Sequence, residues 1–407
     1  MHTQVYKNCF RMLIFFNTIT TAQQAIVIVP VTDLAGSPIE KSQLYTYENL
    51  PLDALDRRCP RIHQLLFNET VEVLEHKDDQ ARISIPNLYY ETANGTKKYT
   101  TYWVQKKHLL DFDTLQKKQY PIDTIPTPID FKNKKHHTNE QQIVTLHTPF
   151  YDSKNKICYS AGTRFVQAPE QNNPEKISVY ILNPKKVSCS IQAIPKHLCI
   201  VANHLSKQEK IDMFITILRS WCCNSNTFIP YVWGGCSFTQ RYPNESFVTE
   251  KIATNTSYYY PQIDKKSIKM GMDCSNMIAQ SAQIVGMPFY FKNSFTILKA
   301  LTPISQEDDL EPGDIIWIPG HLLVVADIAN NTLIEASSYL HGDGRIQEIP
   351  ISRVFHSINT YQQLKQAHLL KKKLQRINTL THVVETPQLS VVLLKMSSIW
   401  DNENPST

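Results

Sequence analysis

The residues Met272-Asp273-Cys274-Ser275-Asn276, with the run that follows them to Gly286, are the most informative segment for the fold. This run reads as a helix that stops at Gly286, because Pro288 comes just beyond it. Cys274 would lie in the first turn, where the helix dipole favours a thiolate and a nearby imidazolium favours it further. Cys274 is therefore a candidate nucleophile, and the competing interpretation is a buried structural cysteine.

His321 is the candidate base. It follows Pro319-Gly320 and opens the apolar strand predicted at residues 322–326. A histidine at the mouth of a strand, after a glycine, can project across the core towards the start of the helix. A lone histidine is usually an ordinary polar residue, so Cys274 and His321 form a catalytic unit only if the fold brings them together.

Composition narrows the function classes. The 407 residues suffice for two to four domains, and 42% of them are apolar, which is ample for folded cores. The net charge is only +5 and no basic run interleaves with aromatic residues, so no nucleic-acid partner is expected. Nine cysteines are present, but no spacing among them is typical of a zinc site. We therefore expect no metal and no organic cofactor.

The first 24 residues read either as a short secretory signal or as a disordered tail. Lys7 and Arg11 precede the apolar run 12–16, which Asn17 breaks. The signal predicts a periplasmic or secreted protein, whereas the tail predicts a cytoplasmic one. No later segment reaches the ~18 apolar residues that a spanning helix needs, so no membrane span is expected.

Two β-rich regions follow, at residues 25–110 and 141–200, and each is expected to form a small β-barrel. Their predicted strands are residues 26–31, 70–74, 81–85, 102–104, 143–146, 163–166 and 177–181. Residues 111–140, which contain three prolines and a basic run, are expected to form a linker.

A third domain with a C-terminal extension is predicted at residues 205–395. Ser206 and Glu209 form a capping box that starts its first helix. Its predicted strands are residues 315–318, 322–326 and 334–336. The apolar stripe of a further helix in the extension consists of Leu364, Ala367, Leu370, Leu374 and Ile377.

Four short motifs occur in a fixed order in this part of the chain. They are Pro230-Tyr231-Val232-Trp233-Gly234-Gly235, Met272-Asp273-Cys274-Ser275, Pro312-Gly313-Asp314-Ile315-Ile316-Trp317 and Gly320-His321. In this order they resemble the NlpC-type family of cell-wall cysteine peptidases, over residues 205–356. The resemblance implies an α+β, papain-like domain, with the nucleophile on a helix packed against a small antiparallel sheet that carries the histidine. That family often has N-terminal bacterial Src-homology-3-like barrels, which the two β-rich regions resemble.

The arrangement resembles the γ-D-glutamyl-L-diamino-acid endopeptidases, which cleave stem peptides of peptidoglycan. It implies that Cys274 attacks the amide carbonyl, that His321 moves the proton, and that water hydrolyses the thioester. The Cys274 amide, with Tyr231 nearby, would stabilise the oxyanion. The implied partner is peptidoglycan or a muropeptide. Two other classes stay open: an acyltransferase or amidase of the same superfamily, and a non-catalytic cell-wall binding protein.

Three features depart from the family pattern. The insertion at residues 236–270 is longer than the usual loop, and Asn276 stands where glycine is usual. The third catalytic position, usually His, Asn or Gln, falls on Glu335, which we expect to accept a hydrogen bond from His321. His341 or Asp343 is the alternative at this position.

The resemblance also bears on substrate choice. The similar endopeptidases hold the free amine of a terminal L-alanine with an acid after the catalytic helix, the Asp beside the nucleophile and a barrel tyrosine. Asp273 and Ser275 match the positions that flank the nucleophile, but Lys292 or Asn293 falls where the acid would be. Tyr102 is a candidate wall of this pocket, although barrel core is its simpler interpretation. We therefore expect a weaker dependence on a free amine, with Asp273 as its main anchor.

Overall fold

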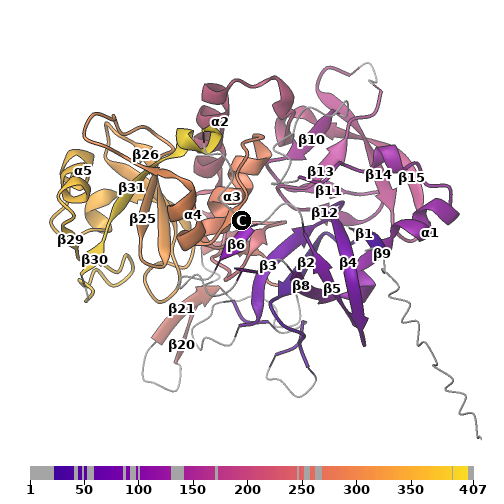
Figure 1. Ribbon diagram of the computed structural model, residues 1–407, viewed down its shortest axis with the longest axis horizontal. Coiled ribbons are helices and arrows are strands. Elements are labelled where there is room, and N and C mark those ends of the chain that lie inside the picture. The colour runs from indigo at the N-terminus through magenta and orange to yellow at the C-terminus, as the bar shows by residue number, and fades with distance from the viewer. Residues whose placement is uncertain are drawn as a thin grey trace, which may run out of the picture.

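Figure 1 shows the computed structural model, in which the β-rich regions lie on one side, the C-terminal region lies on the other, and α3 (Cys274–Ile284) lies between them. The structure describes residues 23–401 with internal gaps at 41–44, 48–49, 53–58, 86–88, 92–97, 100, 130–141, 170–172, 245–246, 252–256, 262–267 and 387. The predicted signal or tail therefore lies almost entirely outside the described residues, and the first strand begins at Gln23.

The first β-rich region forms one antiparallel sheet of seven strands in the order β3-β2-β8-β5-β4-β1-β9. These strands are β1 (Gln23–Val27), β2 (Val31–Ala35), β3 (Arg61–Leu66), β4 (Thr70–Lys77), β5 (Gln80–Ser84), β8 (Thr101–Gln105) and β9 (Leu109–Asp111). Within the described residues, the edge strands β3 and β9 do not pair with each other, so this sheet is open. A closed barrel, as expected from the sequence, is not what these pairings form.

The second β-rich region is divided among small antiparallel sheets. Its strands are β10 (Ile143–Leu146), β11 (Phe150–Asp152), β12 (Ile157–Tyr159), β13 (Arg164–Val166), β14 (Lys176–Asn183), β15 (Ser188–Pro195) and β16 (Cys199–Ile200). The predicted strands are present, but their described pairings again close no barrel. Short strands with alternating burial favour pairing with a neighbour, and this pattern does not specify whether the sheet closes.

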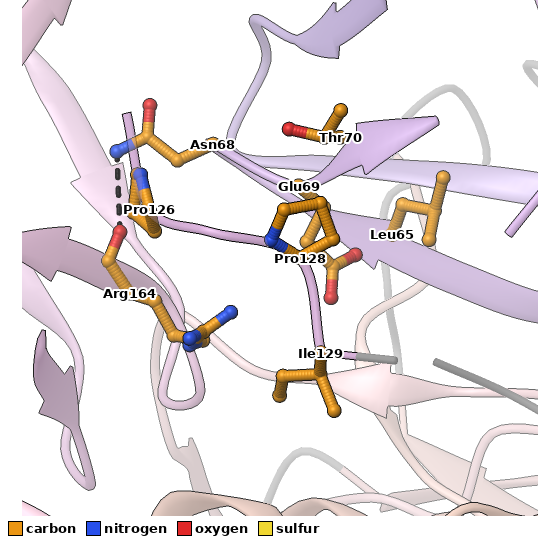
Figure 2. Close-up of a pocket in the computed structure, with 8 residues that line it drawn as sticks. All are labelled: Leu65, Asn68, Glu69, Thr70, Pro126, Pro128, Ile129 and Arg164. Atoms are coloured by element: carbon orange, nitrogen blue, oxygen red, sulfur yellow. Dashed lines mark hydrogen bonds between the residues drawn. The ribbon is translucent and has the colours of Figure 1, made fainter. Parts of the chain in front are cut away.

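The segment expected to be a linker packs against both β-rich regions. It begins with α1 (Phe112–Lys117), whose Leu115 is buried in one cluster with Val144 and Phe165. Farther on, Pro126, Pro128 and Ile129 line a cavity of about 10 Å³ between the two regions, which is shown in Figure 2. This volume has room for about one water molecule. Beside it Asn68 donates to the Arg164 carbonyl at 3.1 Å, so the two regions are joined directly.

A six-stranded antiparallel sheet forms the centre of the C-terminal region, in the order β24-β31-β25-β26-β27-β28. Its strands are β24 (Thr302–Pro303), β25 (Ile315–Ile318), β26 (His321–Asp327), β27 (Thr332–Ala336), β28 (Ile346–Pro350) and β31 (Val392–Lys395). β31 comes from the C-terminal extension and pairs with both β24 and β25. The extension is therefore an integral part of the sheet that carries His321.

This sheet is covered on both faces. Along β26, Leu322 and Val324 belong to the core cluster that contains α2 (Lys207–Trp221) and α3, whereas Leu323 and Val325 belong to a second cluster with α5 (Tyr361–Leu369). Successive strand residues point to opposite faces. A strand covered twice needs a continuous apolar run, which explains why residues 322–326 do not alternate with polar residues.

The helices of the C-terminal region begin at well-defined caps. The predicted capping box of α2 (Lys207–Trp221) is confirmed, because Ser206 and Glu209 each accept the other's backbone amide. Asn293 is the N-cap of α4 (Ser294–Ala300). α5 ends at Leu369, so the longer helix predicted for the extension is wrong beyond that point. Leu374 lies instead in β29 (Lys373–Leu374), because the chain turns there to pair with β30 (Leu389–Ser390).

Smaller elements complete the chain. They are β6 (Tyr89–Glu91), β7 (Lys98–Tyr99), β17 (Thr227–Phe228), β18 (Cys236–Ser237), β19 (Tyr242–Pro243), β20 (Phe247–Lys251), β21 (Ser257–Pro261), β22 (Gly271–Met272), β23 (Phe291–Lys292), η1 (Lys106–His108), η2 (Ile122–Thr124), η3 (Lys196–Leu198), η4 (Ala202–His204), η6 (Ile351–Arg353) and η7 (Met396–Trp400). The insertion at 236–270 contains the hairpin of β20 and β21, which projects from the molecule in Figure 1.

Candidate active site

Cys274 is the first residue of α3, as the sequence predicts. The helix begins there because the Asp273 carboxylate accepts the Asn276 amide at 2.7 Å and so caps the free end. The Leu322 amide, one residue after His321, faces the Cys274 thiol. The start of α3 and the start of β26 therefore meet at this point.

Burial decides the protonation state of the Cys274 thiol. It raises the pKa of Cys274 to about 12, and the neighbouring Asp273 charge acts in the same direction. The Leu322 and Ser275 amides and the Lys292 ammonium lower this pKa, but by less. Desolvation therefore outweighs the stabilisation that a helix start gives to a thiolate, and the resting thiol is protonated at neutral pH. It needs a base to become a nucleophile.

His321 and Glu335 lie side by side on the sheet, as predicted. The Nε2 atom of His321 is 3.0 Å from Oε2 of Glu335, which is fully buried on β27. Glu335 pairs directly with Leu323, two residues after His321, so all three side chains share one face. With Nε2 directed at the carboxylate, Nδ1 is the ring nitrogen left to accept a proton.

Two further residues hold Glu335. Arg376 places Nη2 at 3.0 Å from Oε2, and Gln347 donates to Oε1 at 3.2 Å. Burial, and then the Arg376 charge, lower the pKa of His321 from its ordinary value, against the opposing effect of Glu335. Although burial raises the pKa of Glu335, the charges and hydrogen bonds of Arg376 and His321 outweigh it and lower this pKa overall. At pH 7 the ring is therefore neutral and the carboxylate is ionised.

The alternatives to Glu335 have other partners. His341 lies with Nδ1 3.1 Å from the carboxylate of Glu385, and Asp343 lies 4.0 Å from Arg345. Of the three acidic or basic candidates for the third position, Glu335 is the one that contacts His321.

Asp273 is enclosed by donors from four residues. Oδ1 accepts the Asn276 amide and the Ser275 hydroxyl, and Oδ2 accepts the Gly234 amide, the Asn276 side chain and the Lys292 ammonium. A carboxylate offers about four lone-pair positions, so its capacity is used. Lys292 is the strongest of these partners, at 2.8 Å with side-chain exposures of 4% for Lys292 and 10% for Asp273.

This arrangement corrects the expected role of Asp273 as the anchor of a substrate amine. The Lys292 ammonium already occupies the carboxylate, so a second ammonium would have to displace a buried ion pair. Ser275 is likewise buried and donates to Asp273. Asn276, which departs from the family glycine, contributes a side-chain hydrogen bond to the Gly235 carbonyl at 2.9 Å.

The remaining predicted binding residues serve the fold. Tyr102 is fully buried in the core of the first sheet and offers no surface to a substrate, which corrects its expected place in a pocket wall. Asn293 caps α4 by accepting the Thr296 amide. Tyr231 is buried, with its carbonyl accepting the hydroxyl of Tyr339 at 2.9 Å.

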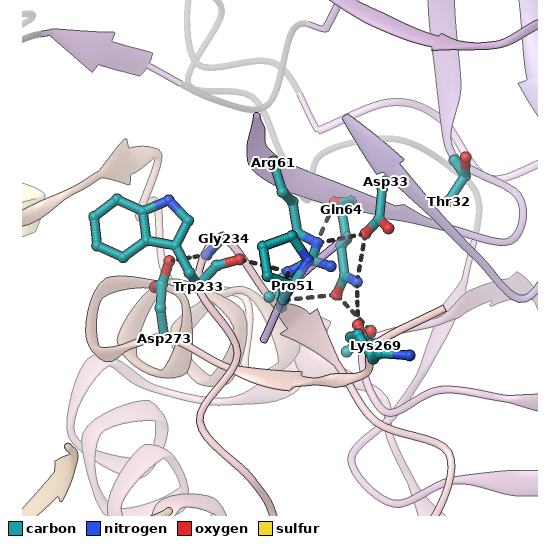
Figure 3. A network of polar contacts seen from close by, with 12 residues as sticks. Thr32, Asp33, Pro51, Arg61, Gln64, Trp233, Gly234, Lys269 and Asp273 are labelled. Atoms are coloured by element: carbon teal, nitrogen blue, oxygen red, sulfur yellow. Dashed lines mark hydrogen bonds and ion pairs between the residues drawn. The ribbon is translucent and has the colours of Figure 1, made fainter. Parts of the chain in front are cut away.

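Residues of the first β-rich region lie beside the segments that lead to α3, as Figure 3 shows. Arg61 is fully buried, pairs with Asp33 at 2.8 Å and donates to the Trp233 carbonyl at 3.0 Å. Trp233 precedes Gly234, whose amide donates to Asp273. Gln64 donates to the Lys269 carbonyl at 2.8 Å. These contacts fix both segments that flank the cap of α3.

Two more contacts link this region to the same place. β6 pairs in parallel with β23, which carries Lys292. His63 of β3 is buried beside Asn276, and burial followed by the Lys292 charge lowers its pKa well below the ordinary value. The first β-rich region therefore lies against the site. The sequence suggested such a contact through Tyr102, whereas the residues that make it are Arg61, Gln64 and His63.

From the sequence, Lys292 was noted only because it falls near the position where the similar endopeptidases have an acid. Arg376, Gln347 and Arg61 were not singled out. Arg376 lies 41 residues after Glu335. Arg376 stands close behind the exposed basic run Lys371-Lys372-Lys373, and nothing in the local sequence distinguishes the one buried cation from these neighbours.

Several solved structures are similar to this chain. An NlpC/P60 family protein from Bacillus cereus is 15% identical, with a TM-score of 0.49, covering 81% of this chain and 94% of that one. NlpC2 from Trichomonas vaginalis is 11% identical, with a TM-score of 0.29 and coverages of 92% and 99%. The peptidoglycan hydrolase RipB from Mycobacterium tuberculosis is 20% identical, with a TM-score of 0.24 and coverages of 37% and 64%. No family model matches the sequence, and no curated protein matches it.

In the part of the chain that the structure describes, no group of three or more histidine, cysteine or acidic residues is arranged to hold a metal ion. None of the helices described is long and apolar enough to cross a membrane.

Proposed function

We propose that this protein is a cysteine endopeptidase that hydrolyses amide bonds in peptidoglycan stem peptides, at the D-γ-glutamyl-diaminopimelate bond. The observation that carries the proposal is the buried His321–Glu335 pair at the start of β26, where the next amide faces the Cys274 thiol. The proposal assigns the nucleophile to α3, the base to β26 and the orienting acid to β27.

In the first half of the reaction, Nδ1 of His321 takes the proton of the Cys274 thiol as the sulfur attacks the amide carbonyl. The developing oxyanion is stabilised by amides at the start of α3, beginning with that of Cys274. The imidazolium then gives its proton to the leaving amine, the carbon–nitrogen bond breaks, and a thioester remains on Cys274.

In the second half, neutral His321 takes a proton from water, and the resulting hydroxide attacks the thioester carbonyl. The carbon–sulfur bond breaks, and the proton returns from His321 to the thiolate. Glu335 accepts a hydrogen bond from Nε2–H throughout, which fixes the tautomer with Nδ1 as the base.

Cell-wall peptides as substrates imply that the protein acts outside the cytoplasm, in the periplasm or after secretion. The two β-rich regions would then serve as Src-homology-3-like modules beside the papain-like domain of residues 205–395. The first of them contributes the Arg61 and Gln64 contacts that support the cap of α3.

The proposal is tested by mass spectrometry of muropeptides before and after incubation with the protein. We expect products cut between D-glutamate and the diamino acid, with a free γ-carboxyl group on the glutamate. An excess of a simple amino acid such as glycine in a parallel reaction, whose amine does not readily intercept a thioester by itself, distinguishes hydrolysis from transfer. Intact muropeptides would refute the peptidase, and products carrying the amine in place of water would favour an acyltransferase.

Substrate choice is a separate prediction. Because Lys292 occupies Asp273, we expect no strong requirement for a free amine on the terminal L-alanine. Acetylating the amine of L-Ala-γ-D-Glu-diaminopimelate should lower kcat/KM by less than about tenfold, whereas losing a charge-assisted hydrogen bond costs about 10- to 100-fold. Turnover of both tripeptides measures the difference. Abolished cleavage of the acetylated form would contradict this prediction.

A further inference from the structure

Arg376 reaches the candidate site from the C-terminal extension. Its side chain is only 4% exposed, and Nη2 lies 3.0 Å from Oε2 of Glu335. The backbone around it is fixed on both sides, because the Ile377 amide donates to the Val354 carbonyl and the Glu385 amide donates to the Arg376 carbonyl. The guanidinium is therefore held against Glu335 by the fold of the extension.

Arg376 and His321 share one oxygen of the carboxylate. Both Nη2 of Arg376 and Nε2 of His321 lie 3.0 Å from Oε2 of Glu335. An unpaired buried carboxylate would draw a proton onto the imidazole, because no solvent screens its charge. A carboxylate already neutralised by a guanidinium still accepts the ring N–H but attracts the extra proton much less.

Three charged or titratable groups act on the His321 ring. They are Glu335 from β27, Arg376 from the extension and His341 from the loop after β27. On the α3 side, the Cys274 thiol faces the amide of the next residue, Leu322. Glu335 stabilises the imidazolium, whereas burial, Arg376 and His341 destabilise it. Among these groups, Arg376 is the one that carries a full positive charge and contacts Glu335, the hydrogen-bond partner of the His321 ring.

We propose that Arg376 is a positioning residue that cancels the charge of Glu335, so that the carboxylate orients His321 while leaving the ring free to act as a base. The inference rests on the proposed function, because it assigns Glu335 and His321 the roles given above. Hydrolysis of the thioester requires neutral His321 to take a proton from water. Arg376 thus keeps the second half of the reaction running at neutral and mildly acidic pH.

The test is the titration of His321 in an Arg376→Met variant, which keeps similar bulk without charge. NMR spectra of protein with ¹³C-labelled histidine give the ring titration, and a His321→Gln variant assigns the signal. We expect the pKa of His321 to rise by about 1–2 units. The acid limb of kcat for muropeptide hydrolysis should move upwards by the same amount, and Arg376→Lys, which keeps the charge, should move much less.

Arg353→Met is the matched control. Arg353 also ties the extension to the domain, through the Thr379 carbonyl at 3.0 Å, but it does not contact Glu335. Its titration and activity should match the wild type. Loss of activity in Arg376→Met with an unchanged His321 titration would reduce Arg376 to a structural role and overturn the proposal.

Two further variants guard against misfolding, because Arg376→Met leaves a buried carboxylate unpaired. Glu335→Gln/Arg376→Met removes both charges and should fold, and Glu335→Gln alone leaves Arg376 in place. We expect His321 to titrate at a higher pH in the double variant than in Glu335→Gln, and the double variant to be the more active of the two. Equal titrations would refute the inference. The NMR measurement needs no substrate, so it stands even if muropeptides are not cleaved.

Discussion

Replacing Cys274 with alanine is expected to lower muropeptide hydrolysis by about 10³-fold or more, because no covalent thioester can form without the sulfur. Substrate binding and the oxyanion amides remain, so the variant should still bind muropeptides. The measurement is the rate of product formation by mass spectrometry under conditions that saturate the wild type. Thermal unfolding of the variant should resemble that of the wild type, since one small buried atom is lost.

Cys158→Ala is the control for general effects of cysteine removal. Cys158 is a partly buried thiol of the second β-rich region, and it contacts the Thr239 carbonyl at 3.4 Å. This variant should keep wild-type turnover. If Cys274→Ala were to hydrolyse muropeptides at the wild-type rate, the sulfur would not be the nucleophile and the proposed mechanism would fail.

Replacing Lys292 with methionine is expected to destabilise the protein by about 3–5 kcal/mol, because it leaves the buried Asp273 carboxylate without its cation. Asp273 also caps α3, so the damage falls on the turn that carries Cys274. The free energy of unfolding, measured in denaturant at pH 7, gives the cost. Muropeptide turnover should fall as well, since the start of α3 positions both the sulfur and the oxyanion amides.

Lys299→Met provides the matched comparison. Lys299 is an exposed lysine seven residues further along, with its ammonium 4.5 Å from the ring of Phe295. Its loss should change the unfolding free energy by no more than about 0.5 kcal/mol. The double variant Asp273→Asn/Lys292→Met should recover part of the lost stability, because no unpaired charge remains. A stable Lys292→Met single variant would show that the ion pair is not needed.

Local features of the chain were predictable because their causes are local. The capping box that starts α2 involves residues three positions apart, and the cap of α3 likewise joins Asp273 to Asn276. The strands at residues 143–146 and 315–318 were predicted with the bounds that β10 and β25 have. Helical and strand periodicity, glycine stops and capping side chains are all encoded within a few residues.

Contacts between distant segments were predictable only in part. The placement of Glu335 beside His321 followed from a hairpin, in which register fixes which residues face one another. The partners Arg376 and Arg61 lie far from the residues they contact, and no spacing rule relates them. Whether the β-rich sheets close was also beyond local pattern, since closure depends on the twist and stagger of all strands together.

The helix that begins at Cys274, the strand that begins at His321 and the acid that faces it all follow from the order of residues along the chain. The charge states of these groups follow only from how the chain packs. A position at a helix start predicts a thiolate, yet burial raises the pKa of Cys274 to about 12. Asp273 reads as a free anchor for an amine, yet Lys292 is folded onto it. The reason is physical: the charge state of a side chain depends on how much water and which charges surround it, and only the packed chain sets both.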